Sequence, residues 1–198
     1  CAAEVAKSAL PRRREEYIKI LRLSQPSLVF TELFDLGILA HIMPTLNKLF
    51  LDPEKAFLFL KTLEELKQIR PPWSEPFELF SLFVYSYIWA RDLENPSSID
   101  SLESDASLLS FMKDELGMFK LESSVFFKTL RLKSSLLRTE YYLRKGERRQ
   151  KAFLAQEPLP LSLFLSLKDQ SLSTKDYYFW MNQLSKFSSQ QVKNHQRS

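Results

Sequence analysis

Apolar residues recur at helical spacing along most of this chain, and proline or glycine separates the periodic segments. No stretch alternates apolar and polar residues between turn signals, so the sequence predicts no strand. We therefore predict an all-α fold, a multi-helix bundle of roughly eight to ten helices. The predicted helices cover about residues 12–23, 26–36, 53–70, 75–91, 106–116, 122–146, 147–155, 161–170 and 173–188.

Several helix ends are marked by residues that favour caps or breaks. Asp52 followed by Pro53 suits an N-cap and a first helical position. Gly37 can adopt the left-handed conformation that is common just after a helix. Ser173 and Asp176 have the spacing of a capping box at the start of the last helix. These residues predict short connections between the helices.

The segment 75–91 is dense in aromatic side chains. Phe80 and Phe83 stand three residues apart, and Trp89 continues near that face two turns later. Rings in this number can hardly all face water, so we predict that these three side chains lie in the core.

The composition is that of a folded domain. The chain has 198 residues, of which 44% are hydrophobic and 26% charged, enough for one well-buried domain or two small ones. No apolar run approaches the roughly 20 residues that span a bilayer, so we predict no membrane contact. A single cysteine is consistent with the reducing cytoplasm, where we expect the protein to be. Because the first residue is Cys1 and not Met, we expect a fragment that begins within a longer protein.

Basic charge is concentrated in one segment. The formal net charge is only +4 and the pI is near 9.1, but residues 128–151 contain nine Lys and Arg against two Glu. Residues 92–105 are instead acidic and Ser-rich, and we predict a long loop there. On one continuous helix, four of the cations would share a stripe with the rings of Phe127 and Tyr142. These four are Lys128, Arg131, Arg138 and Lys145.

Cations interleaved with aromatic rings suit single-stranded RNA, because cations neutralise phosphates and rings stack on bases. The alternative interpretation is a solvated helix face whose cations offset acidic neighbours such as the 92–105 loop.

Residues that could bind a metal or catalyse a reaction are not grouped in this sequence. Cys1, His41 and His195 are single and far apart, which disfavours a metal site. The acidic pair Glu103 and Asp105 has no glycine beside it to bind phosphate, and we interpret it as solvated surface. Neither a P-loop nor a GxGxxG motif occurs. We predict that this chain alone is not catalytic and binds no metal.

Three segments together give a resemblance to a known family. Pro11–Phe50 joins a charged helix opening to the phrase Leu33–Leu39, and Pro76–Phe83 is an aromatic helix. Lys128–Phe153 has a basic core at Arg144–Arg149. This order resembles the helical C-terminal region of bacterial poly(A) polymerases, which are class II nucleotidyltransferases related to the CCA-adding enzymes.

The resemblance implies the RNA-binding part of such an enzyme without its catalytic head. The head of that family has a Gly-Ser turn for the triphosphate and an Asp-x-Asp pair for two metal ions, and no Gly-Ser dipeptide occurs here. ATP and Mg²⁺ are implied for the full-length enzyme but not for this chain. The implied partners are RNA and the N-terminal head of the same protein, and DNA is not expected. The implied organisation is an RNA-binding-like region over 1–52 and a C-terminal arm over 53–198, which includes the basic segment 128–151.

The implied function is to hold the RNA 3′ region for nucleotide addition by the head. The alternatives are the tail of a CCA-adding enzyme and a helical adaptor that binds proteins. The candidate RNA-contacting residues are Arg12, Arg13, Lys19, Lys128, Arg131, Arg138, Tyr142, Arg144, Lys145, Arg148 and Arg149. For the first helix a structural interpretation competes, because Arg12 with Glu16 and Glu15 with Lys19 are spaced for ion pairs on the helix surface.

Overall fold

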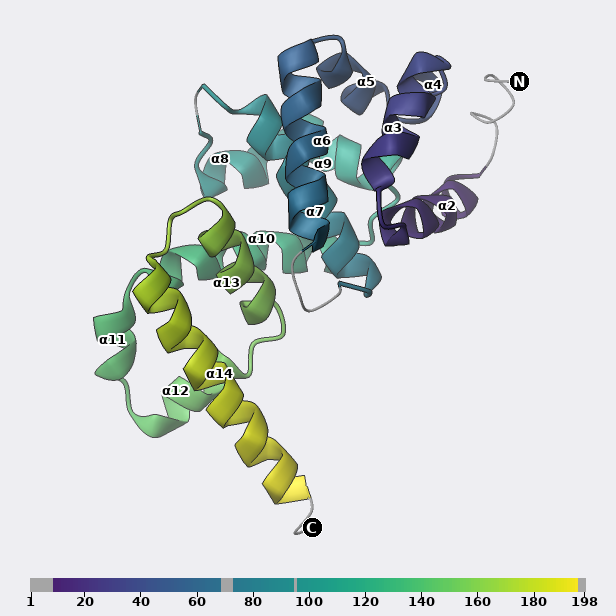
Figure 1. Ribbon diagram of the computed structural model, residues 1–198. Helices are drawn as coiled ribbons and strands as arrows, with labels where there is room; N and C mark the ends of the chain where they lie inside the picture. Colours follow the sequence, from purple (N-terminus) through teal and green to yellow (C-terminus); the bar gives the residue numbers. More distant parts are fainter. Residues whose placement is uncertain (1–8, 69–72, 95, 196–198) are drawn as a thin grey trace. The chain divides into compact units, whose positions relative to one another are not determined.

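The computed structural model describes residues 9–68, 73–94 and 96–195, and within them the chain is helical throughout (Figure 1). These residues form thirteen α-helices and one π-helical turn, and no strand occurs among them. The all-α prediction is confirmed. The helices outnumber the prediction because the predicted helix over 122–146 is broken in two. In addition, residues 39–42, 44–50 and 99–104, where no helix was predicted, are helical.

The chain divides into two compact units between Ser124 and Val125. The division falls inside α10 (Lys120–Leu136), so one helix contributes residues to both units. The functional boundary after residue 52 concerns RNA contact and stays a prediction.

Unit 1 is built around α7. Its helices are α2 (Leu10–Arg22), α3 (Pro26–Asp35), α4 (Leu39–Ile42), α5 (Pro44–Phe50), α6 (Pro53–Gln68), α7 (Pro76–Arg91), α8 (Ile99–Ser104) and α9 (Ala106–Ser110), followed by the π-helical turn η1 (Phe111–Glu115) and the start of α10. Helix α7 lies beside α6 and also packs against α2 (Figure 1). Two predicted helix ends are confirmed: the amides of Glu54 and Lys55 donate to Asp52 Oδ1, and Gly37 has φ +69°.

A cluster of aromatic rings forms the core of unit 1. Phe83 is 1% exposed, and its ring centroid lies 5.1 Å from that of Phe30 and 5.2 Å from that of Phe59. Phe80 is also buried, as predicted. The prediction for Trp89 is wrong, because this side chain is 39% exposed. Nine residues are about two and a half helical turns, which puts Trp89 on the side of α7 opposite Phe80.

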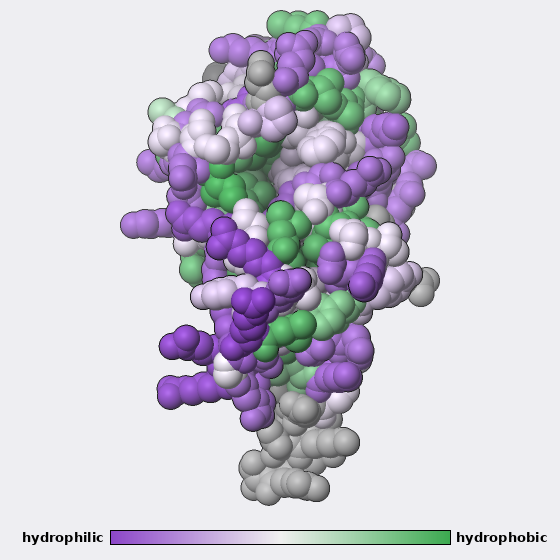
Figure 2. Space-filling model, turned by 90° about the vertical axis from the view of Figure 1, so that its left-hand side faces the viewer, coloured by the Kyte–Doolittle hydropathy of each residue, from purple (hydrophilic) through white to green (hydrophobic). Residues whose placement is uncertain are grey.

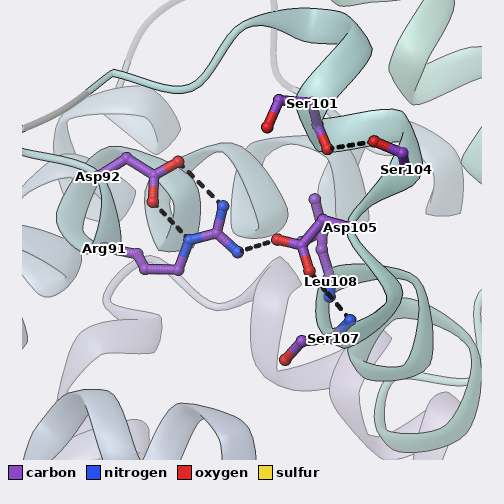
Figure 3. Close-up of polar contacts among 7 residues, drawn as sticks. All are labelled: Arg91, Asp92, Ser101, Ser104, Asp105, Ser107 and Leu108. Atoms are coloured by element: carbon purple, nitrogen blue, oxygen red, sulfur yellow. Dashed lines mark hydrogen bonds and ion pairs between the residues drawn. The ribbon is translucent and has the colours of Figure 1, made fainter.

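The acidic segment 92–105 is held within unit 1 by Arg91, as Figure 3 shows. Arg91 Nε lies 2.5 Å from Asp92 Oδ1, and Arg91 Nη1 lies 2.7 Å from Asp105 Oδ2. The amides of Ser107 and Leu108 donate to Asp105, which thereby caps α9. The segment predicted as one loop contains α8 and is fixed at both ends.

These contacts set the charge state of Asp105. Partial burial alone would raise the pKa of Asp105. Hydrogen bonds from the Leu108 amide and from the Arg91 guanidinium, together with the charge of Arg91, bring the pKa below its ordinary value. Asp105 is therefore a charged carboxylate whose partners are Arg91 and the backbone amides at the start of α9.

Unit 2 packs its helices around Trp180. It contains the rest of α10, α11 (Thr139–Leu143), α12 (Glu147–Leu154), α13 (Leu159–Lys168) and α14 (Thr174–His195). Helix α14 packs against α12 and α13, and Trp180 is fully buried in the resulting core. The predicted cap of α14 is confirmed, because the Asp176 amide donates to Ser173 Oγ over 3.1 Å.

The predicted continuous helix over 122–146 is wrong, because α10 ends at Leu136 and α11 begins at Thr139. In a continuous helix the carbonyl of Leu136 would accept from the amide of Glu140. It accepts instead from the indole Nε1 of Trp180, at 3.1 Å, and from the hydroxyl of Thr139, at 3.4 Å. These two hydrogen bonds take the place of the helical one at the break, and the break removes the single stripe of cations.

Candidate nucleic-acid interface

Helix α2 carries the candidate cations of unit 1. Arg12 and Lys19 are exposed, whereas Arg13 is half-buried and donates to the carbonyl of Ile42 at 3.2 Å. Lys19 Nζ lies 2.8 Å from Glu16 Oε1, so the ion pair that forms is not one of the two predicted. Both side chains of this pair are more than half exposed, and such a pair is weak enough to open for a phosphate.

Arg14, which the sequence did not single out, anchors the inner face of α2. Its guanidinium lies 2.5 Å from Glu122 and 4.3 Å from the ring centroid of Phe119. Seven residues are about two turns, so Arg14 shares the side of α2 that buries Leu21. In the sequence, Arg14 stands seven residues before Leu21. This spacing was the signal that could have distinguished Arg14 from the neighbouring residues that face solvent.

Cations of unit 2 divide into those that hold the fold and those that face solvent. Lys133 forms an ion pair with Asp169, and both side chains are largely buried. Lys128 and Arg131 are exposed on α10, and Arg138 is exposed between α10 and α11. The helix break separates Arg138 from the face that Lys128 and Arg131 share.

The densest group of exposed cations surrounds the turn from α11 to α12, at the predicted turn residue Gly146. Arg144 precedes the turn, and its pair with Glu140, at 3.7 Å, leaves both side chains at least 80% exposed. Arg148 and Arg149 follow the turn, and neither forms an ion pair within the described residues. In Figure 2, strongly hydrophilic side chains project from the lower half of the face that carries α11 in Figure 1.

The assignment of Tyr142 to RNA stacking is corrected by the structure. Tyr142 is 4% exposed, and its ring centroid lies 4.7 Å from that of Trp180 and 5.6 Å from that of Phe153. Burial also raises the pKa of the Tyr142 hydroxyl. A ring packed in this way has no face open to a base. Because α11 starts anew after Arg138, the exposed ring is that of Tyr141, which is 60% exposed.

These cations can hold a polyanion on the surface. Among the described residues, no group of three or more His, Cys, Asp or Glu is placed to hold a metal ion. Within the same residues, no helix combines the length and the apolar character needed to cross a membrane. What the site offers is therefore positive charge and one open aromatic ring.

A family model matches residues 1–50, and its description reads "Probable RNA and SrmB- binding site of polymerase A". The match supports an RNA-binding region like that of poly(A) polymerases over α2 to α5, which includes Arg12, Arg13 and Lys19. It does not reach the turn from α11 to α12. Comparison with curated proteins and with solved structures finds no match.

Proposed function

We propose that this chain is the RNA-binding portion of a poly(A) polymerase-type nucleotidyltransferase. It holds the 3′ region of an RNA while a head domain outside the chain adds nucleotides. The observation that supports this proposal is the match of residues 1–50 to the RNA-binding site of polymerase A. ATP and Mg²⁺ belong to the head in this proposal, and nucleotide addition takes place in the cytoplasm.

The distribution of charge supports the same proposal. Between Arg138 and Lys151 there are six Lys and Arg against two Glu, a local excess equal to the formal net charge of +4 of the whole chain. The rest of the chain therefore sums to zero. A local excess of exposed cations is the electrostatic footprint expected of a phosphate-binding surface.

The proposal is tested by measuring the affinity of the full chain for labelled oligo(A) between 50 and 200 mM salt. Binding through phosphates predicts that the logarithm of the affinity falls linearly with the logarithm of the salt concentration, by about 0.7 per neutralised phosphate. An oligo(dA) of the same length is expected to bind less well, because it lacks the 2′-hydroxyl groups. No measurable affinity for any RNA would overturn the proposal.

Folded tRNA is the discriminating ligand for the alternative within the same superfamily. A poly(A) polymerase-type chain is expected to bind unstructured oligo(A) at least as tightly as tRNA. A clear preference for tRNA would instead favour the tail of a CCA-adding enzyme, whose substrate is a folded shape.

One observation favours the adaptor function as a second candidate. Large apolar side chains of unit 1 are exposed close together in the sequence. They are Leu28, Leu36, Leu51 and Phe57, each more than 60% exposed. An adaptor would show neither appreciable RNA affinity nor a steep dependence on salt, so the titration above separates the two functions.

A further inference from the structure

We propose that Tyr141 is the base-stacking residue of a single-stranded RNA site at the turn from α11 to α12, and that Arg148 and Arg149 hold the adjacent phosphates. This inference rests on the proposed function and goes beyond it by naming the site and the form of RNA that it accepts. The site lies outside residues 1–50, which the family model matches.

The ring of Tyr141 is largely exposed and lies next to a cation. It is 60% exposed, and Lys145 Nζ lies over it at 4.6 Å from the ring centroid. The ammonium group covers one face, so the solvent-exposed part of the ring can receive a base. The same ammonium group lies 5.9 Å from the ring centroid of Phe153, which is part of the packing around the core of unit 2. Lys145 thus ties the exposed ring to a fixed support.

The backbone of the turn is held by a single side chain. The Gln150 amide nitrogen lies within hydrogen-bonding distance of three carbonyls: those of Tyr142 (3.3 Å), Leu143 (3.3 Å) and Lys145 (2.9 Å). Next to Tyr141, the ring of Tyr142 is packed into the core. Because these contacts hold the backbone of the turn, little ordering of that backbone is left to occur on binding, which favours affinity.

Charge on both sides of the turn is open to a ligand. Glu147 forms an ion pair with Lys151, at 2.6 Å, and none with its neighbours Arg148 and Arg149. Guanidinium groups bind phosphate oxygens through paired hydrogen bonds, and they remain charged at any physiological pH. Arg144 adds a cation before the turn, since its pair with Glu140 is highly exposed.

An unpaired base is what this geometry accepts. In an A-form duplex the base faces are covered by their neighbours, so a protein ring can stack only on a base that has left the helix. Stacking on a tyrosine does not read hydrogen-bonding edges, and it therefore accepts every base, with a modest preference for the larger face of a purine. The ligand inferred for this site is thus unstructured RNA, as opposed to the paired region of a folded RNA.

The test compares affinities of the full chain and its variants for fluorescein-labelled oligo(A) at fixed salt. Tyr141→Ala and Tyr141→Leu are expected to weaken binding by about 5- to 150-fold, whereas Tyr141→Phe, which keeps the ring, should stay within about twofold of the original chain. Tyr178→Ala is the matched control, because Tyr178 is another tyrosine of unit 2 and is 66% exposed. The salt dependence should be the same for all variants, since no phosphate contact is removed.

Two kinds of failure are distinguishable in this test. If the original chain binds no oligo(A), both the proposed function and the stacking site are overturned. If the original chain binds with a steep salt dependence but Tyr141→Ala and Tyr141→Leu bind as tightly as Tyr178→Ala, only the stacking site is overturned. A second arm uses an RNA duplex of the same length, for which replacing Tyr141 should change the affinity by less than about twofold. A loss on the duplex as large as that on oligo(A) would also refute stacking on an unpaired base.

Discussion

Replacing the cations around the turn from α11 to α12 should reduce the salt dependence of RNA binding by a predictable amount. The change is the simultaneous replacement of Arg144, Lys145, Arg148 and Arg149 by Ala. All four are exposed except Lys145, which is half-buried, and none has a buried carboxylate partner that the replacement would strand. The variant should therefore fold, and its effect should be on the affinity for RNA.

The magnitude follows from the number of phosphates that these cations can neutralise. On a single strand each neutralised phosphate contributes about 0.7 to the slope, so four cations contribute up to about 3. Between 50 and 200 mM salt, a slope difference of that size corresponds to a change of about 50-fold in the ratio of the two affinities. The loss should be nearly uniform across RNA sequences, because phosphate contacts position a strand without reading its bases.

The assay is fluorescence anisotropy of labelled oligo(A) with the full chain, after circular dichroism has shown that the variant keeps its helices. The matched control replaces four other exposed lysines and so removes the same charge. These are Lys113, Lys120, Lys175 and Lys186, all of which lie outside residues 1–50. An unchanged slope in the folded variant would mean that the turn is a solvated face. An equal flattening in the control would mean that only the overall charge matters, and would equally refute a site at the turn.

Three further outcomes can be checked on the same protein. Phe83→Ala should lower the free energy of unfolding by about 3–5 kcal/mol in urea denaturation, because it removes the ring at the centre of the unit 1 core. Gly117→Ala should lower the melting temperature, because Gly117 has φ +69° and a Cβ there would lie 3.3 Å from Arg14 Cβ. The pKa of Asp105 is lowered in the folded state from its ordinary value of 3.8. As the pH falls toward that value, Asp105 therefore binds a proton more readily in the unfolded state than in the folded state. The stabilisation by Asp105 should therefore be present at pH 6 and lost as the pH falls below about 4. Urea denaturation should show that the difference in free energy of unfolding between the original chain and Asp105→Asn becomes smaller below that pH.

Local signals in the sequence were sufficient for the class of fold and for several helix ends. The cap at Asp52, the left-handed Gly37 and the cap at Ser173 depend on residues within a few positions of each other, and all three are confirmed. Hydrophobic spacing also placed Phe80 and Phe83 in the core. These features were predictable because their causes lie within one or two helical turns of the residue concerned.

The candidate site was less predictable, because the helix break that decides which of its side chains face solvent involves a residue far away in the sequence. At the break after Leu136, the carbonyl accepts from the indole of Trp180, which no local pattern connects to it, as well as from the nearby hydroxyl of Thr139. The break changes which of two adjacent tyrosines faces solvent, and so the sequence led to Tyr142 where the structure exposes Tyr141. The sequence correctly indicated that the segment 128–151 is basic. The predicted arrangement of its charges was wrong because it assumed one continuous helix, which the structure does not have.

The burial of ion pairs is what distinguishes structural cations from cations available to RNA in this chain. Arg14, Arg91 and Lys133 each meet a carboxylate, and the side chains in these pairs are between 10% and 26% exposed. A buried charge requires such a partner, so these three cations are held by the fold.

Exposed cations are under no such requirement. Arg148 and Arg149 have no carboxylate partner within the described residues, and the pair of Arg144 with Glu140 is almost fully solvated. In the acidic segment 92–105, Asp92 and Asp105 are bound by Arg91 within unit 1. Charges that the fold neither uses nor neutralises add self-repulsion to the folded state, and a phosphate backbone is a ligand that would relieve it. By this criterion Lys133 is a cation that the fold uses, and we propose that the turn from α11 to α12, with its dense group of exposed cations, is the main RNA contact of unit 2.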